Sequence, residues 1–132
     1  MVELIWDKNR SGTATAPTGA SITVGERSDF SPDDLLAAAA AGGLMETFLG
    51  RAAGADVSIL SYASASDVTL MGPGEEPRVV IRCYVVTTEG ASPADVERLL
   101  RASLHESPVG RMLGDAVTCQ ADIRCLCGAC AR

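Results

Sequence analysis

The C-terminal end of the chain carries its densest group of reactive side chains, three cysteines within six residues: Cys125, Cys127 and Cys130. Cys127 and Cys130 have the Cys-x-x-Cys spacing that closes a redox disulfide or chelates one thiophilic metal such as zinc. Cys125 would supply a third thiolate, and a tetrahedral site would take its fourth ligand from Cys119, from His105 or from a partner chain. The spacing leaves three interpretations open: a frayed tail with inert thiols, a metal site, or a redox pair.

The other candidate reactive side chains have simple structural interpretations. The stretch 78–88 alternates, with Val79, Ile81, Cys83 and Val85 on one face and Arg78, Arg82 and Tyr84 on the other, and Cys119 lies on the apolar face of the last predicted strand. Cys83 and Cys119 are therefore expected to be small buried core residues. His105, the only histidine, stands next to Glu106 and is expected to be a solvated helix residue. Ser107 directly precedes Pro108, a position typical of a local helix cap.

Serine–proline pairs mark the starts of the predicted helices. Ser31 can cap a helix, Pro32 suits its first position, and Asp33 and Asp34 favour the positive end of the helix dipole. This pattern predicts a helix that runs to about Ala53, with Gly54 as its stop.

The first half of this helix, from Leu35 to Met45, is apolar all round, which predicts a central helix that is buried on every side. Gly42 and Gly43 each cost roughly 1 kcal/mol relative to alanine inside a helix, so a close approach of another backbone is expected there. A small domain with only 4% aromatic residues does not cover such a helix by itself. The sequence therefore favours a homodimer.

Alternating and turn residues predict the remaining elements. A helix begins at Ser92-Pro93-Ala94-Asp95 and is broken by Pro108, with a short helical piece after it. The strands are expected at 2–7, 13–16, 21–24, 57–70, 78–88 and 116–125. Three strands, a helix, two strands, a broken helix and a strand indicate an α+β fold with mainly antiparallel sheet.

The composition restricts the class of protein. The 132 residues are expected to form a single domain (1–132) with a cysteine-rich tail (125–132). A net charge of −6 argues against nucleic-acid partners and anionic membranes. The N-terminus lacks the blocks of a signal peptide, and the longest apolar stretch is too short to span a bilayer. A cytoplasmic location, in which thiols stay reduced, is the expectation.

Two local patterns resemble the OsmC/Ohr family of thiol-dependent hydroperoxide reductases. They are Ser31-Pro32-Asp33-Asp34-Leu35-Leu36-Ala37-Ala38 and Ser107-Pro108-Val109-Gly110-Arg111-Met112-Leu113. With the element order, the resemblance covers the chain from Trp6 to about Arg124. It implies an intertwined homodimer, in which antiparallel sheets from both chains wrap around two central helices and two active sites lie at the interface.

The resemblance also implies a reaction and a set of site residues. In the family, a thiolate attacks the O–O bond, and the resulting sulfenic acid condenses with a second cysteine to a disulfide that a dithiol reduces. The attacking position falls on Gly43 and the resolving position on Ser107, so both sulfurs are missing here. The activating carboxylate falls on Asp33 and the orienting arginine on Arg10, with Arg27 as a rival.

Each of these positions has an alternative role. Gly43 either permits tight helix packing or opens a pocket where the cysteine side chain would sit. Arg10 is alternatively an ordinary turn residue. Asp33 is alternatively a charge that favours the start of its helix.

The leading hypothesis is an OsmC/Ohr-like protein of the stress-response type that lacks the peroxidatic and resolving cysteines. It would bind a small apolar or peroxide-like ligand at the dimer interface, and whether it is an enzyme stays open. One alternative is a thiol-dependent organic hydroperoxide reductase that uses C-terminal cysteines. Another is a metal-binding module in which tail thiolates hold zinc or another thiophilic ion.

Overall fold

The computed structural model of the chain describes residues 1–70, 72–88 and 90–126, and it contains two compact units, Met1–Leu36 and Ala37–Arg132. The elements are β1 (Glu3–Lys8), β2 (Ser11–Thr15), β3 (Ser21–Gly25), α1 (Pro32–Gly54), β4 (Ile59–Thr69), β5 (Arg78–Thr87), α2 (Pro93–Glu106), α3 (Pro108–Leu113), the 3-10 turn η1 (Gly114–Ala116) and β6 (Val117–Cys125). This order confirms the α+β fold predicted from the sequence. Within the described residues, no helix is long and apolar enough to cross a membrane.

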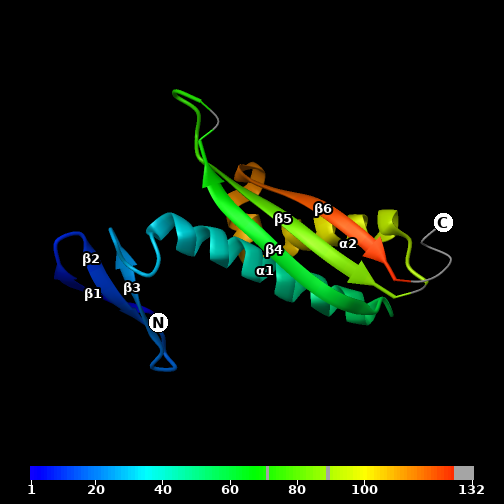
Figure 1. Cartoon of the computed structure of the whole chain (residues 1–132), viewed down its shortest axis with the longest axis horizontal. Helices are drawn as coiled ribbons and strands as arrows, with labels where there is room; N and C mark the ends of the chain where they lie inside the picture. The colour runs from blue at the N-terminus through cyan, green and yellow to red at the C-terminus, as the bar shows by residue number, and fades with distance from the viewer. Residues whose placement is uncertain (71, 89, 127–132) are drawn as a thin grey trace. The chain divides into compact units, whose positions relative to one another are not determined.

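The N-terminal unit, Met1–Leu36, contains an antiparallel meander of strand order β1-β2-β3 (Figure 1). Trp6 pairs with Gly12, which in turn pairs with Val24, so these residues share one face of the sheet. That face is apolar, whereas the opposite face carries Thr13 and Thr23. Trp6 is 73% exposed and Leu4 is 67% exposed, so the apolar face is largely uncovered in this chain.

The C-terminal unit, Ala37–Arg132, contains a sheet of strand order β4-β5-β6. β4 and β5 pair antiparallel, as expected, but β5 and β6 pair parallel, so this sheet is mixed. The physical reason is the connection, because α2 and α3 form a crossover that returns the chain to the end of the sheet where β5 began. The expectation of antiparallel sheet therefore holds for every strand pair except β5–β6.

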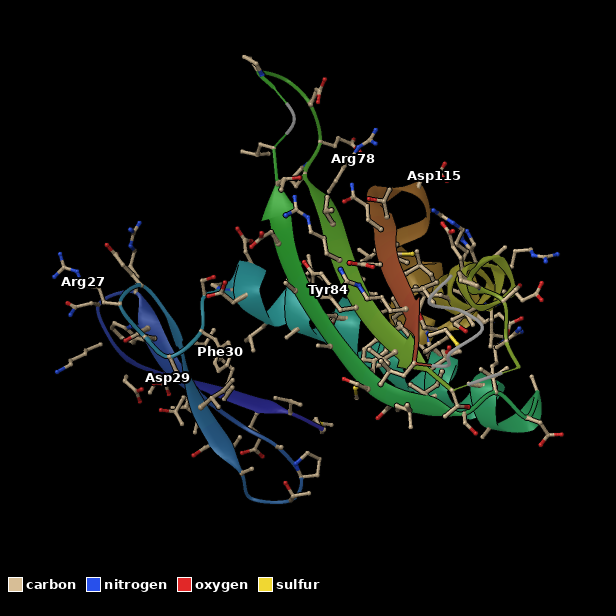
Figure 2. The ribbon with its side chains drawn as sticks, turned by 45° about the vertical axis from the view of Figure 1, so that its right-hand side comes forward. Arg27, Asp29, Phe30, Arg78, Tyr84 and Asp115 are labelled. Carbon is tan, nitrogen blue, oxygen red and sulfur yellow. The ribbon has the colours of Figure 1, made fainter. Side chains whose placement is uncertain are left out.

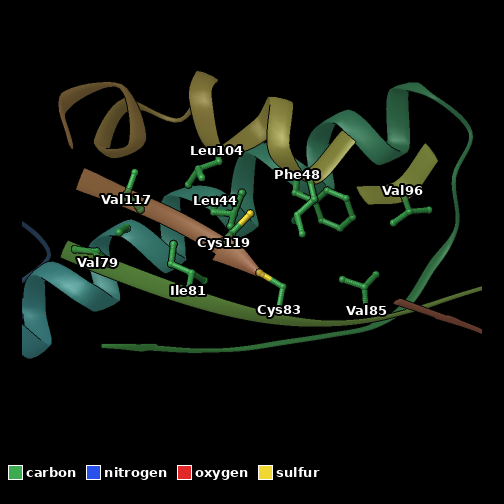
Figure 3. Packing of buried hydrophobic residues seen from close by; sticks show 12 residues of the cluster. Leu44, Phe48, Val79, Ile81, Cys83, Val85, Val96, Leu104, Val117 and Cys119 are labelled. Atoms are coloured by element: carbon green, nitrogen blue, oxygen red, sulfur yellow. The ribbon is translucent and has the colours of Figure 1, made fainter. Parts of the chain in front are cut away.

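The core of the C-terminal unit lies between this sheet and helices α1 and α2, which cover the same face of it (Figures 1 and 3). The predicted alternation of β5 is confirmed, since Val79, Ile81, Cys83 and Val85 are buried and Arg78, Arg82 and Tyr84 are exposed. Leu44 and Phe48 of α1 and Leu100 of α2 pack against the buried face of β5.

Helix α1 differs from the expectation of burial on every side. Its buried residues recur every third or fourth position and form one face: Ala37, Ala40, Leu44, Phe48 and Ala52. Beside this face, Met45 is 39% exposed and Leu49 is 37% exposed. The sheet and α2 of one chain cover only one side of the helix, which leaves an apolar stripe uncovered.

Candidate functional site

Gly43 lies in the middle of α1 and Ser107 lies at the junction of α2 and α3, and the structure brings these two positions into contact. A β-carbon built on Gly43 would lie 3.7 Å from the Cβ atom of Ser107, an ordinary van der Waals distance. Disulfides have a mean Cβ–Cβ separation of about 3.8 Å. The two positions singled out in the sequence are therefore neighbours, with the spacing of a disulfide but no sulfur.

Position 43 does not require glycine for packing within the chain. The atom nearest to the built Cβ is that Ser107 carbon, and no neighbour would have to move. Of the two roles considered for Gly43, tight helix packing is thus not needed inside one chain. The missing side chain instead leaves space beside Ser107.

Ser107 is a fully buried helix cap. It precedes Pro108 and takes the extended conformation that proline imposes, with φ −61° and ψ 141°, so α2 ends and α3 begins at this residue. Its Oγ donates to the carbonyl oxygen of Leu104 at 3.0 Å and accepts from the N–H of Gly110 at 3.2 Å. With both hydrogen-bonding functions used and no exposed surface, this hydroxyl serves structure rather than nucleophilic attack.

Gly110 is a site residue that the sequence reasoning missed. A Cβ at Gly110 would overlap the carbonyl oxygen of Leu104 and lie 2.6 Å from the Oγ of Ser107. Both atoms belong to the cap, so the cap forms only with glycine at this position. The available signal was the spacing Ser-Pro-x-Gly, which places a glycine at the N3 position, where the cap hydrogen bond ends.

The other predicted site residues, Arg10, Asp33 and Arg27, belong to the N-terminal unit. Arg10 makes an ion pair with Glu26, with Nη2 at 2.7 Å from the carboxylate oxygen Oε2. Asp33 lies exposed in the first turn of α1, beside a capping box in which Ser31 Oγ accepts from the Asp34 N–H at 3.1 Å. The Asp34 carboxylate accepts from the Ser31 N–H at 3.0 Å. Hydrogen bonding to the backbone and side chain of Ser31 lowers the pKa of this carboxylate.

The partner of Arg10 could not be read from the sequence. Arg10 and Glu26 are adjacent because the register of the β2–β3 hairpin places Ser11 opposite Gly25.

His105 is exposed, as expected, and is not part of the contact between Gly43 and Ser107. Its neighbour Glu106 makes an ion pair with Arg51 of α1, in which Arg51 Nε donates to Glu106 Oε2 at 2.9 Å.

Two of the three described thiols are enclosed in the core of the C-terminal unit. Cys83 and Cys119 are buried core residues, as predicted, and burial raises the pKa of both. The hydroxyl of Tyr62 lies 3.5 Å from the Cys83 Sγ, and burial raises the pKa of Tyr62 as well. A protonated, enclosed thiol is a poor nucleophile, so these two cysteines do not replace the missing pair.

The raised pKa values predict a loss of stability in alkali. The folded chain keeps the Cys83, Cys119 and Tyr62 protons to higher pH than the unfolded chain, so their contribution is full below the unfolded pKa values and lost as pH rises towards the folded ones. We expect the urea midpoint to fall between about pH 8 and about pH 10.5. Cys83→Ala and Cys119→Ala should each flatten that fall; equal slopes in all three proteins would contradict the assignment.

The C-terminal cysteines are only partly described. Cys125 ends β6 half-buried, and its Sγ donates to the carbonyl oxygen of Thr88 at 3.5 Å. Cys127 and Cys130, which carry the predicted redox pair and metal site, lie outside the described residues. Within residues 1–70, 72–88 and 90–126, no group of three or more His, Cys, Asp or Glu side chains is placed to hold a metal ion.

Comparisons with known proteins identify the fold. No protein-family profile matches the chain, and no curated protein matches its sequence. Solved structures do match. An OsmC-like protein of unknown function from Vibrio cholerae superposes with a TM-score of 0.76 at 16% identity, covering 92% of this chain and 97% of its own.

Two further structures agree. An OsmC-like protein from Mycoplasma pneumoniae has a TM-score of 0.74 at 14% identity, with 96% of each chain covered. The organic hydroperoxide resistance protein OhrB of Bacillus subtilis has a TM-score of 0.66 at 15% identity, covering 93% of this chain and 97% of its own. The OsmC/Ohr-like fold of the single chain is therefore confirmed over nearly its whole length.

Proposed function

We propose, from the fold that this chain shares with OsmC-like and organic hydroperoxide resistance proteins, that it is a stress-response-type protein that binds a small apolar or peroxide-like molecule. It does so without the thiol reaction that the family resemblance implies. The observation that carries the proposal is the contact between Gly43 and Ser107, where two sulfurs would react and neither is present.

The chemistry of the two positions supports binding over turnover. Glycine has no side chain that could attack a peroxide. An alcohol needs an activating base to act as a nucleophile, and the Ser107 hydroxyl already donates to a backbone carbonyl. A serine fixed in this way holds two helices together and leaves the peroxide bond intact.

The proposed ligand site lies at the interface of a homodimer. The C-terminal unit supports such an assembly, because it exposes Met45 and Leu49 on one side of α1. Apolar surfaces of this kind are typical of sites that a protein partner covers.

Leu49→Lys tests both the assembly and the binding. A charge on the uncovered side of α1 should oppose association, so we expect the wild type to have about twice the 13.6 kDa chain mass by light scattering and the variant to have the chain mass. In calorimetry, cumene hydroperoxide should bind the wild type saturably and should be recovered unreduced. The Leu49→Lys variant should show no saturable binding.

Leu60→Lys is the matched control, because Leu60 is an exposed leucine of β4, 55% exposed, outside that stripe of α1. It should keep both the dimer mass and the binding. A monomeric wild type would refute the assembly, and a dimer without saturable binding would refute the binding function.

A further inference from the structure

We propose that the N-terminal unit binds an organic carboxylate with an apolar arm, at the place where an apolar groove meets a cationic pocket. This inference rests on the proposed binding function and adds the chemical class of the ligand. All the residues that carry it lie between Leu4 and Pro32, within one compact unit.

The apolar groove has a volume of about 320 Å³ and is walled by Leu4, Trp6, Val24 and Pro32. This volume lies at the lower end of the range of small-molecule sites. Gly25, which also lines the groove, has φ +124°, and a side chain there would overlap the carbonyl oxygen of Arg10. Bare backbone is thus obligatory at this point, which keeps the groove open beside the Trp6 ring.

The cationic pocket, of about 430 Å³, lies between the turn that joins β1 to β2 and the turn that follows β3. It is lined by Lys8, Arg10 and Arg27, with Glu26 as its one carboxylate. Lys8 is the only lysine of the chain. Three cations against one anion make this pocket positive on a protein whose net charge is −6.

The backbone of both turns is in an unusual conformation. Asn9 has φ +54° and Arg27 has φ +57°, and they are two of the three non-glycine residues with positive φ in the described part of the chain. Such conformations are uncommon, particularly for arginine, and they concentrate at ligand sites. Figure 2 shows Arg27 extending outward from its turn at the end of the meander.

The ion pair with Glu26 shows that Arg10 is placed to bind a carboxylate. The Arg10 Nε and Nη2 atoms lie 2.8 Å and 2.7 Å from the Glu26 carboxylate oxygen Oε2, so the guanidinium is already oriented towards a carboxylate. The side chains are 80% and 54% exposed, and an exposed ion pair contributes little free energy. Another carboxylate can therefore replace Glu26 at small cost.

The two cavities share Arg10 and Ser11. A carboxylate held by Arg10 thus places its attached carbon chain at the entrance of the groove beside Trp6. The cationic residues recognise the head, and the apolar wall recognises the arm.

Trp6 is the only tryptophan, so its fluorescence reports this groove directly. Octanoate, 1-octanol and acetate separate the two parts of the ligand, because octanol has the arm without the charge and acetate has the charge without the arm. We expect a saturable fluorescence change with octanoate, binding at least about tenfold weaker with octanol, and no response to acetate at the same concentration.

Substitutions at the head site give opposite effects. Arg10→Gln should weaken octanoate binding about tenfold or more, because a hydrogen bond to a charged group is lost, while octanol binding stays unchanged and shows that the groove is intact. Glu26→Gln should strengthen octanoate binding, because the competing carboxylate is gone. Arg27→Asn, which tolerates the left-handed turn, should weaken it, and Arg82→Gln on β5 is the control without effect.

Three results would overturn the inference: equal binding of octanoate and octanol, unchanged octanoate binding in Arg10→Gln, or no saturable response of Trp6. Equal binding of the two probes would leave the proposed apolar-ligand function standing and remove only the carboxylate. Mass measured on the same samples shows separately whether the dimer is present.

Discussion

Oxidation of the double variant Gly43→Cys/Ser107→Cys closes a disulfide between α1 and the junction of α2 and α3. We expect this because the two Cβ positions lie 3.7 Å apart, close to the mean of about 3.8 Å in disulfides. A cross-link that closes so long a loop should raise the free energy of unfolding by about 4 kcal/mol relative to the reduced variant. Urea unfolding of the oxidised and reduced forms measures the difference, and peptide mapping identifies the bond.

A matched control separates geometry from the mere presence of thiols. Gly42→Cys/Ser107→Cys moves one cysteine by a single residue around α1, where no atom lies within 4 Å of the built Cβ. This control should form no bond between positions 42 and 107. Equal cross-linking in both variants, or none in either, would contradict the pairing of Gly43 with Ser107.

Replacement of Gly110 by alanine is expected to disrupt the cap at the same site. The added Cβ would overlap the Leu104 carbonyl oxygen and press on the Ser107 Oγ, so either the α2–α3 junction opens or its hydrogen bonds break. Overpacking of a rigid site together with loss of a buried hydrogen bond should cost about 3 kcal/mol. Chemical unfolding with far-ultraviolet circular dichroism checks this value.

Gly72→Ala is the control for the substitution itself, since the nearest atoms to a Cβ there belong to the Glu75 side chain at 3.8 Å or more. It should change the free energy of unfolding by well under about 1 kcal/mol. A Gly110→Ala protein as stable as the wild type would show that the cap does not depend on this glycine.

Local patterns made much of the fold predictable. The alternation of β5 and the caps at Ser31 and Ser92 depend on a few neighbouring residues, and the structure confirms them. The break at Pro108 follows from the missing N–H of proline and the extended backbone that it imposes on Ser107.

The remaining features depend on contacts between distant segments. The sequence of β6 does not show whether it pairs parallel or antiparallel, because buried and exposed residues alternate along a strand in either direction. The one-sided burial of α1 depends on how much surface the sheet covers, which an all-apolar run does not encode.

The candidate site divides in the same way. The sequence patterns pointed to Gly43 and Ser107, but the space between them follows from the packing of α1 against the α2–α3 junction. The pairing of Arg10 with Glu26 likewise follows from hairpin register. The spacing Ser-Pro-x-Gly is a signal for Gly110, but the need for glycine there depends on where the fold places the Leu104 carbonyl and the Ser107 hydroxyl.

The most direct test of the central claim is the consumption of cumene hydroperoxide by the purified wild-type protein with a dithiol reductant. Because Gly43 and Ser107 supply no sulfur, we expect a rate equal to that of the dithiol alone, whereas Gly43→Cys/Ser107→Cys should exceed it. Wild-type turnover well above the dithiol rate would contradict the claim. If that turnover were then lost on deletion of residues 125–132, the reaction would be assigned to the C-terminal cysteines.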